Sequence, residues 1–125
     1  MTPCRRATLA DIEAVNEWGQ GDYSAFLADP LNVYLISGNG GALFAWRAPD
    51  VFEVHVALEQ RGKAAFAVMH EMLDYMRTNC GARLFWTAIP PASRHVIMFA
   101  RRMGWKSRGL AKFAHGICEI FVEGY

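Results

Sequence analysis

A strand runs directly into a helix in the stretch that decides the fold: Val54-His55-Val56-Ala57-Leu58-Glu59-Gln60-Arg61-Gly62-Lys63-Ala64-Ala65. The strand belongs to the apolar run 51–58, and the loop after it holds one glycine and two basic residues. The helix that follows carries one apolar stripe, formed by Ala65, Met69, Met72 and Met76. Free amides at a helix start attract anions, so the loop predicts a seat for an anion such as a phosphate. An ordinary turn with solvated Arg61 and Lys63 is the alternative.

Two further helices are predicted, one on each side of this stretch. The first begins with a capping box, Thr8-Leu9-Ala10-Asp11, and its apolar residues recur at helical spacing: Leu9, Ile12, Val15 and Trp18. The second begins at Ser93 as the expected N-cap, and its apolar stripe consists of Val96, Phe99, Ala100 and Met103. A short helical turn is also expected between Tyr23 and Leu27.

The remaining apolar runs read as strands. The glycine-rich loop 38–41 and the pair His115-Gly116 each join two such runs, so two hairpins are predicted. The run 84–89 is unbroken, which is typical of a strand buried on both faces. The predicted strands are 33–37, 42–48, 51–58, 84–89, 105–112 and 117–122. Residues 1–125 are therefore expected to form a single domain of the α/β (α+β) class.

Composition excludes several classes of protein. The chain is 53% hydrophobic and 20% charged, which excludes global disorder, and its apolar runs are too short to cross a bilayer. The first residues carry charge without an apolar run behind them, so no secretory signal is expected. Cys4, Cys80 and Cys118 are far apart and odd in number, which predicts free buried thiols in the reducing cytoplasm.

The charged residues favour neither a metal nor a nucleic acid. The nearest approach to a metal motif is His70-Glu71-x-x-Asp74 on the polar face of the central helix, so we expect no metal site. The net charge is only +1. A basic cluster lies in the last third of the chain without alternating aromatic residues, which disfavours nucleic acid as a partner: Arg94, Arg101, Arg102, Lys106, Arg108 and Lys112.

Two polar side chains share one face of the strand 51–58. Alternation places Glu53 and His55 on the same side, opposite Phe52 and Val54. Because an unpaired buried carboxylate is costly, the two either pair with each other or line a wet cleft. A Glu–His pair at a solvated edge is the alternative.

These residues resemble the GNAT (Gcn5-related) N-acetyltransferase superfamily over nearly the whole chain. The opening 6–12 is similar to the family's first strand and helix, and Gln60-Arg61-Gly62-Lys63 resembles the start of its pyrophosphate loop. Ala82-Arg83-Leu84 through Pro90, followed by Ala92-Ser93, is similar to the family's later strand and the start of its last helix. Phe99-Ala100-Arg101-Arg102-Met103-Gly104-Trp105 resembles the closing "Leu-Gly-Phe" segment. The chain also looks like the small, Ala-rich members that are often phage-encoded.

The resemblance implies a mixed sheet of about six to seven strands flanked by three to four helices. It also implies acetyl-CoA as co-substrate, held in a V-shaped gap between the strands 51–58 and 84–89, and a direct attack by a primary amine on the thioester. Either Glu53 or His55 would be the general base. The residues implied to hold the co-substrate are Val56, Ala57, Leu58, Arg61, Gly62, Lys63, Ala64, Ala65, Phe66 and Ser93.

The chain departs from the family's pattern at several positions. Ala64 and Phe66 replace small residues of the loop, and Ser93 replaces the usual Asn. Ala100 stands at the place of the usual tyrosine acid, so either Tyr34 or Tyr125 replaces that acid or the CoA thiolate leaves unaided.

Two functions are therefore weighed. The first is an N-acetyltransferase acting on a small-molecule or peptide amine. The alternative is a catalytically degenerate binding or structural protein with the same fold, associated with a phage or a virion. The many aromatic residues, with 4 Trp and 8 Phe, suit an exposed apolar interface and hence a homodimer.

Overall fold

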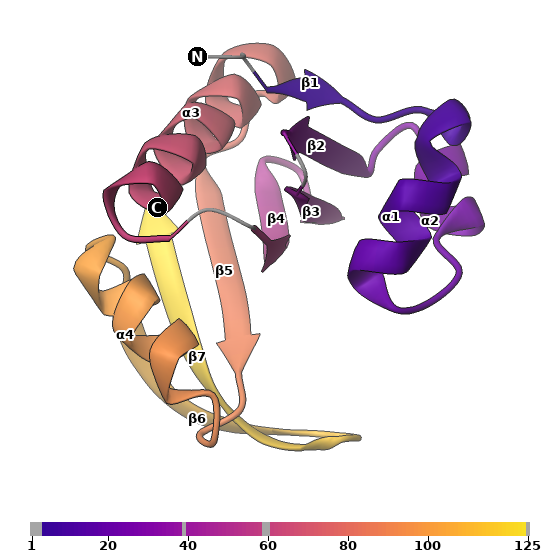
Figure 1. The fold of residues 1–125 in the computed structure, drawn as a ribbon. Helices are drawn as coiled ribbons and strands as arrows, with labels where there is room; N and C mark the ends of the chain where they lie inside the picture. The colour runs from indigo at the N-terminus through magenta and orange to yellow at the C-terminus, as the bar shows by residue number, and fades with distance from the viewer. Residues whose placement is uncertain (1–3, 39, 59–60, 125) are drawn as a thin grey trace.

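The computed structural model describes residues 4–38, 40–58 and 61–124. Within them the chain forms seven strands and four α-helices, as expected for the α/β class (Figure 1). The elements are β1 (Arg5–Arg6), η1 (Leu9–Asp11), α1 (Ile12–Gly19), α2 (Ser24–Ala28), β2 (Val33–Ser37), β3 (Gly40–Ala48), β4 (Val51–Ala57), α3 (Lys63–Cys80), β5 (Leu84–Ile89), α4 (Arg94–Arg102), β6 (Lys106–Phe113) and β7 (Gly116–Gly124). Four residues of the stretches used in the sequence argument lie outside the described part: Asn39 in the loop 38–41, Glu59, Gln60 and Tyr125.

All seven strands belong to one sheet, in the order β1-β2-β3-β4-β5-β7-β6. Both predicted hairpins are confirmed, because β2 pairs antiparallel with β3 and β6 pairs antiparallel with β7. The one parallel pairing joins β4 to β5, and its register covers only Val51–Leu84, Phe52–Phe85 and Glu53–Trp86. Beyond Glu53 the two strands separate, which leaves a gap in the middle of the sheet.

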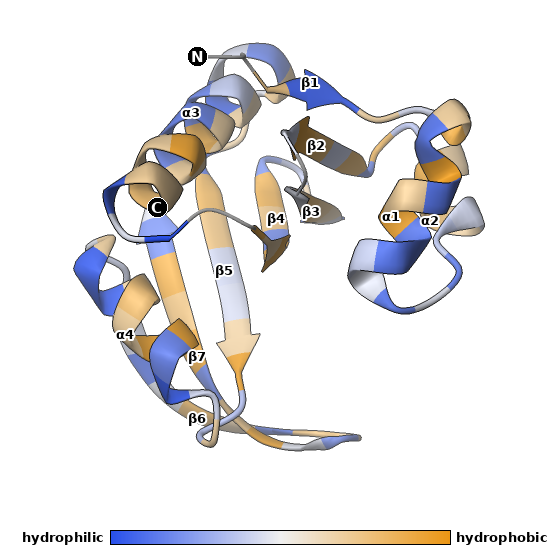
Figure 2. Cartoon of the chain, in the orientation of Figure 1, coloured by the Kyte–Doolittle hydropathy of each residue, from blue (hydrophilic) through white to orange (hydrophobic). Residues whose placement is uncertain are grey.

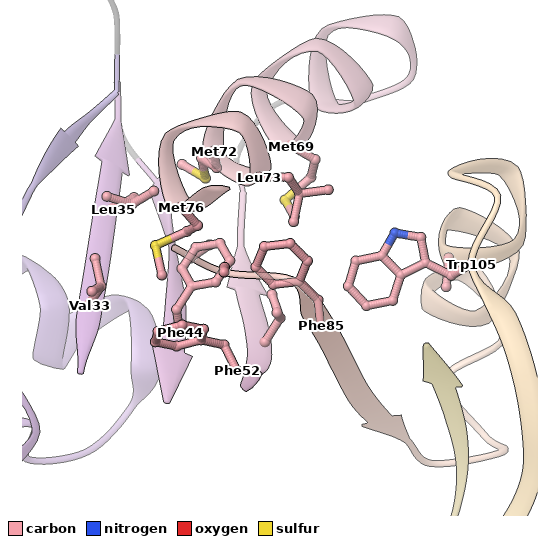
Figure 3. Packing of buried hydrophobic residues seen from close by; sticks show 14 of the residues in the cluster. Val33, Leu35, Phe44, Phe52, Met69, Met72, Leu73, Met76, Phe85 and Trp105 are labelled. Carbon is pink, nitrogen blue, oxygen red and sulfur yellow. The ribbon is translucent and has the colours of Figure 1, made fainter. Parts of the chain in front are cut away.

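The main core lies between the sheet and α3. The predicted apolar stripe of this helix is confirmed, since Ala65, Met69, Met72 and Met76 are all buried. The side chains of Met69, Met72 and Met76 pack on aromatic residues of the central strands, including Phe44, Phe52 and Phe85 (Figure 3). Both α3 and α4 carry hydrophobic and hydrophilic residues along their length, as helices with one face on a sheet do (Figure 2).

The sheet's other face is covered only in part. The helices α1 and α2 lie there beside β2 and β3, and the second, smaller core contains Val15, Tyr34 and Ile36 (Figure 1). The expectation that the run 84–89 is buried on both faces is therefore wrong. Phe85 and Ile89 are buried on the side of α3, whereas Trp86 and Ala88 are only half-buried because α1 and α2 do not extend over β5.

The thiols are free, as expected, but they are not all buried. Cys118 is buried, while Cys4 and Cys80 are intermediate in exposure. Burial is the main reason why the pKa of Cys4 rises to about 11 and why the pKa of Cys80 also rises.

The capping box at the first helix is confirmed. The Thr8 side chain accepts a hydrogen bond from the Ala10 amide, and the Asp11 carboxylate accepts one from the Thr8 amide at 2.9 Å. The box opens a single 3-10 turn before α1 begins. Leu9 lies in that turn and is 54% exposed, so its predicted place on the apolar face is wrong.

In Asp11→Asn, the free energy of unfolding is expected to fall less than in the wild type as the pH is lowered from about 4 to 2. Hydrogen bonds from Arg5 and from the Thr8 amide lower the pKa of Asp11 from 3.8 to about 2. Because the folded pKa lies below the unfolded one, the ionised carboxylate stabilises the fold above about pH 4, and this contribution is lost as the pH falls toward 2. Urea unfolding at several pH values measures it. At pH 7 the expected loss is below about 1 kcal/mol, since the ion pair is exposed. Equal acid sensitivity of both proteins would contradict the prediction.

Candidate active site

The gap between β4 and β5 contains a cavity of about 220 Å³. One wall consists of residues of β4, the other of residues of β5, and α4 closes one side. Most of the lining is apolar, which suits the alkyl part of a ligand better than a charged group. The lining residues are Val54, His55, Val56, Met69, Thr87, Ala88, Ile89, Pro90, Ser93, Val96, Phe99, Ala100, Met103 and Trp105.

The backbone of β4 is accessible along this gap. Residues of β4 up to Ala57 remain paired with β3 on the other side, but the register with β5 ends at Glu53. Val56, an apolar residue in the middle of a sheet, is accordingly 41% exposed. Within the described residues, the backbone N–H and C=O groups of β4 that face the gap beyond Glu53 therefore have no strand partner. A ligand in the gap can hydrogen-bond to these groups.

Three polar side chains meet at the edge of the cavity. Glu53 Oε2 lies 2.5 Å from His55 Nε2, and Glu53 Oε1 accepts a hydrogen bond from Arg47 Nε at 2.8 Å. The register of β3 shifts between Trp46 and Ala48, and this irregularity contains Arg47. The sequence predicted that Glu53 and His55 would either pair with each other or line a wet cleft. The structure shows the pair, and of the two residues His55 alone lines the cavity.

The environment of Glu53 keeps this carboxylate charged. Burial alone would raise its pKa, but the hydrogen bonds from His55 and Arg47 outweigh burial, so the pKa of Glu53 lies below its usual value. Its side chain is 14% exposed, whereas that of His55 is 50% exposed. Of the two, His55 is therefore the group that a ligand in the cavity can reach, and Glu53 holds the imidazole in place.

The predicted anion seat at the start of α3 is only partly built as expected. Gly62 is the N-cap with φ of +59°, a conformation that other residues rarely adopt, and the Phe66 amide donates to its carbonyl at 3.1 Å. Arg61 donates to the Leu58 carbonyl at 2.8 Å. Lys63 and Ala64 are exposed, but the side chain of Ala65 is buried in the core. Of Ala65, therefore, only the backbone could contact the co-substrate, which is the role that the resemblance implied for this residue.

A second cavity of about 180 Å³ lies between the start of α3 and α4. Phe66 and Phe99 stack at 5.0 Å between ring centroids, and Phe99 lines both cavities. Phe66 of α3 thus contacts α4 through this stack. The lining residues are Gly62, Phe66, His95, Met98, Phe99 and Arg102.

The structure brings some predicted site residues together and separates others. His55, Val56 and Ser93 line the first cavity, and Gly62 and Phe66 line the second. Ser93 is the N-cap of α4 without a side-chain capping bond. Ala57 and Leu58 line neither of these two cavities. Tyr34 lines neither cavity; its burial raises its pKa to about 12, which makes it a poor replacement for the missing acid.

Sequence reasoning missed three contributions to the site. No sequence pattern indicated that Arg47 contacts Glu53, because this contact depends on the irregular register of β3. Phe99, Ala100 and Met103 were recognised as a buried stripe, but nothing in their spacing shows that they border a cavity. Trp105 follows Gly104 at the end of α4, and only the packing of the whole chain places it in the lining.

Other predicted features concern the surface. All six residues of the basic cluster are exposed, and Arg101 also lies 3.5 Å from Glu119. In the ranges 4–38, 40–58 and 61–124, no group of three or more His, Cys, Asp or Glu side chains could hold a metal ion. Among the helices of these same ranges, none has the length and apolar character needed to span a membrane.

Comparison with known proteins identifies the fold. No protein-family model matches the sequence, and no curated protein matches it. Solved structures do match: a mutant of the spermidine N-acetyltransferase from Vibrio cholerae is 11% identical with a TM-score of 0.80, and the match covers 98% of this chain and 95% of that one. An aminoglycoside acetyltransferase in complex with coenzyme A is 14% identical with a TM-score of 0.74, covering 98% and 94%.

A third match is a putative acetyltransferase from Salmonella typhimurium, solved with acetyl-CoA. It is 20% identical with a TM-score of 0.72, and the match covers 96% of this chain and 91% of that one. The coverage is nearly complete on both sides in all three cases. The chain therefore has the GNAT fold, which it shares with these three matching structures, as the resemblance implied.

Proposed function

We propose that this protein is an N-acetyltransferase that transfers the acetyl group of acetyl-CoA to a primary amine. The observation that carries the proposal is the apolar cavity in the gap between β4 and β5, with the Glu53–His55 pair at its edge. The matches solved with coenzyme A and with acetyl-CoA support acetyl-CoA as the co-substrate. Fold alone does not define an activity, so the argument depends on these residues.

The chain offers separate places for the two ends of acetyl-CoA. The unpaired edge of β4, which includes Val56 and Ala57, supplies backbone groups for the amide-bearing arm, and the apolar cavity takes the thioester end. The start of α3, from Arg61 to Phe66, supplies backbone amides for the pyrophosphate. Arg102 lines the second cavity beside this turn and adds a positive charge there.

His55 is the proposed general base. When Nε2 carries a proton and donates it to Glu53, Nδ1 is free to accept a proton from the attacking amine. Glu53 is a positioning residue that stabilises the imidazolium formed, and Arg47 keeps Glu53 ionised. This arrangement assigns different roles to the two residues that the sequence left as alternatives.

The reaction balances without a protein acid at Ala100. The amine nitrogen bonds to the acetyl carbon, the carbon–sulfur bond breaks, and His55 takes the proton that the nitrogen loses. A backbone amide of β4 at the gap stabilises the oxyanion. A thiol is ordinarily about half ionised near pH 8.5, so the CoA thiolate leaves without prior protonation and takes a proton from water afterwards.

The acceptor is proposed only as a class. Spermidine and aminoglycosides, named for the matching enzymes, are polyamines, and His55 is half exposed, so an amine can approach it from solvent. Small polyamines and peptide amines are therefore the acceptors to screen.

Calorimetric titration with acetyl-CoA tests the proposal, with CoA and ADP as matched ligands. We expect micromolar dissociation constants for acetyl-CoA and CoA, and weaker binding of ADP, which reaches only the start of α3. If acetyl-CoA does not bind at millimolar concentration, the proposed function is wrong and the alternative of a protein that retains only the fold is favoured.

A further inference from the structure

Trp105 lines the cavity between β4 and β5 and carries a buried polar atom. It follows Gly104 directly after α4, and its backbone amide donates to the Ala100 carbonyl at 3.1 Å. Only 7% of the residue is exposed, and it lines the cavity together with Ala100 and Met103. Figure 3 shows its ring pointing from the end of α4 toward Phe85, into the middle of the protein.

The indole nitrogen of Trp105 lacks a hydrogen-bond partner. Among the buried side-chain nitrogen and oxygen atoms of the described residues, Trp105 Nε1 is the one without an acceptor. An indole N–H can only donate, so a carbonyl, thiolate or other acceptor must come to it. Buried polar groups are nearly always satisfied, and one that is not costs stability in the protein alone.

The residues that line the cavity favour a bound molecule as the hydrogen-bond acceptor for Trp105 Nε1. The lining residues Val96, Phe99, Ala100 and Met103 have side chains without oxygen. The hydroxyl groups of Thr87 and Ser93 also line the cavity, but neither bonds to Trp105 Nε1. The volume of about 220 Å³ is several times the roughly 30 Å³ share of a water molecule, which leaves room for part of a ligand.

We propose that Trp105 Nε1–H donates a hydrogen bond to the thioester end of acetyl-CoA and to the CoA thiolate that leaves. This inference rests on the proposed function. Trp105 lines the first cavity and not the second, so it faces the part of acetyl-CoA that enters the sheet rather than the pyrophosphate at α3. A fixed donor beside the sulfur stabilises the negative charge that develops there as the carbon–sulfur bond breaks. The indole keeps its proton throughout, and the thiolate is protonated by water.

Proton–nitrogen correlation spectra of the indole groups test this contact directly. The four tryptophans, Trp18, Trp46, Trp86 and Trp105, give four indole signals, and each Trp→Phe variant assigns one of them. On saturation with acetyl-CoA or CoA, we expect the Trp105 Nε1–H proton to move downfield more than the other three. ADP, which lacks the pantetheine arm, should not move it.

Binding and turnover of Trp105→Phe give a second readout. The phenyl ring retains much of the apolar volume and removes only the donor, so we expect acetyl-CoA affinity to fall about two- to tenfold. The turnover number should fall as well, because the contact strengthens as charge develops on sulfur. Trp18→Phe is the matched control, since Trp18 stacks on Tyr34 in the second core, and it should change neither value.

The outcomes separate this inference from the proposed function. If calorimetry shows binding but the Trp105 signal does not move, Trp105 is not a donor to the ligand, while the proposed function stands. If acetyl-CoA does not bind, both are wrong. If Trp105→Phe does not fold, the wild-type spectra still decide, because variants at the other three tryptophans assign their signals and leave that of Trp105.

Discussion

Replacing His55 by alanine is expected to lower the turnover number by about 10²- to 10⁴-fold, the usual contribution of a general base. The dissociation constant of acetyl-CoA should hardly change, because the backbone of β4 and the start of α3 remain as they are. Steady-state kinetics with a polyamine acceptor and calorimetry with acetyl-CoA measure the two quantities. The prediction follows from the geometry: His55 lines the cavity and is held by Glu53 at 2.5 Å.

Two further variants test whether the loss of turnover arises from the Glu53–His55 pair. Glu53→Gln keeps the shape of the side chain but removes the charge that stabilises the imidazolium, so a smaller loss of about ten- to a hundredfold is expected. His70→Ala is the matched control, because His70 lies on the exposed face of α3 and should leave turnover unchanged. Full activity of His55→Ala would place the base elsewhere, and loss of folding in both site variants would make the Glu53–His55 pair structural.

Phe85→Ala is expected to destabilise the protein by about 3–5 kcal/mol, the range for removing a fully buried aromatic ring. Phe85 has 0% exposure, packs edge-to-face on Phe44 at 5.9 Å and lies 5.5 Å below the Arg77 guanidinium. It also pairs with Phe52 at the point where β4 and β5 are still joined. Since single domains are stable by only about 5–15 kcal/mol, this one change removes a large share of the total.

Guanidinium unfolding measures the loss as a lower transition midpoint with an unchanged slope. Phe113→Ala is the matched control, because Phe113 is only half-buried at the end of β6 and stacks on His115 at 5.6 Å. Its expected cost is clearly smaller. Equal costs for the two variants would show that the seam between β4 and β5 is no more tightly packed than the hairpin end.

Local patterns in the sequence predicted most of the fold. The stripe of α3 is confirmed because four residues at helical spacing can only share one face, and both hairpins are confirmed because glycine-rich turns leave few other connections. The prediction for Leu9 is wrong because this residue lies in the 3-10 turn before α1, and the prediction for the run 84–89 is wrong because one face of β5 is left partly uncovered. Whether an apolar side chain is covered depends on how far α1 and α2 extend over the sheet, which spacing along the chain does not show.

The candidate site was predictable only where it coincides with local geometry. Alternation along β4 placed Glu53 beside His55, and the pair is present. The contact of Glu53 with Arg47 and the burial of Trp105 arise between segments that are distant in sequence, so no local pattern indicates them. The resemblance indicated that Ala100 replaces the usual acid. The unpartnered N–H donor of Trp105, in contrast, can be recognised only in the folded chain.

The short parallel register between β4 and β5 divides the sheet into two antiparallel blocks. Strands β1 to β4 form one block and β5 to β7 the other, and within the sheet only three residue pairs hold them together. Apart from the short edge strand β1, the strands within each block pair over more residues than β4 and β5 do, so the boundary between the blocks is a weak line across the middle of the sheet. A molecule that hydrogen-bonds to both edges of the gap would continue the pairing between β4 and β5 beyond Glu53. The two blocks would then be joined over a greater length while that molecule is bound, and by the three pairs alone after it leaves.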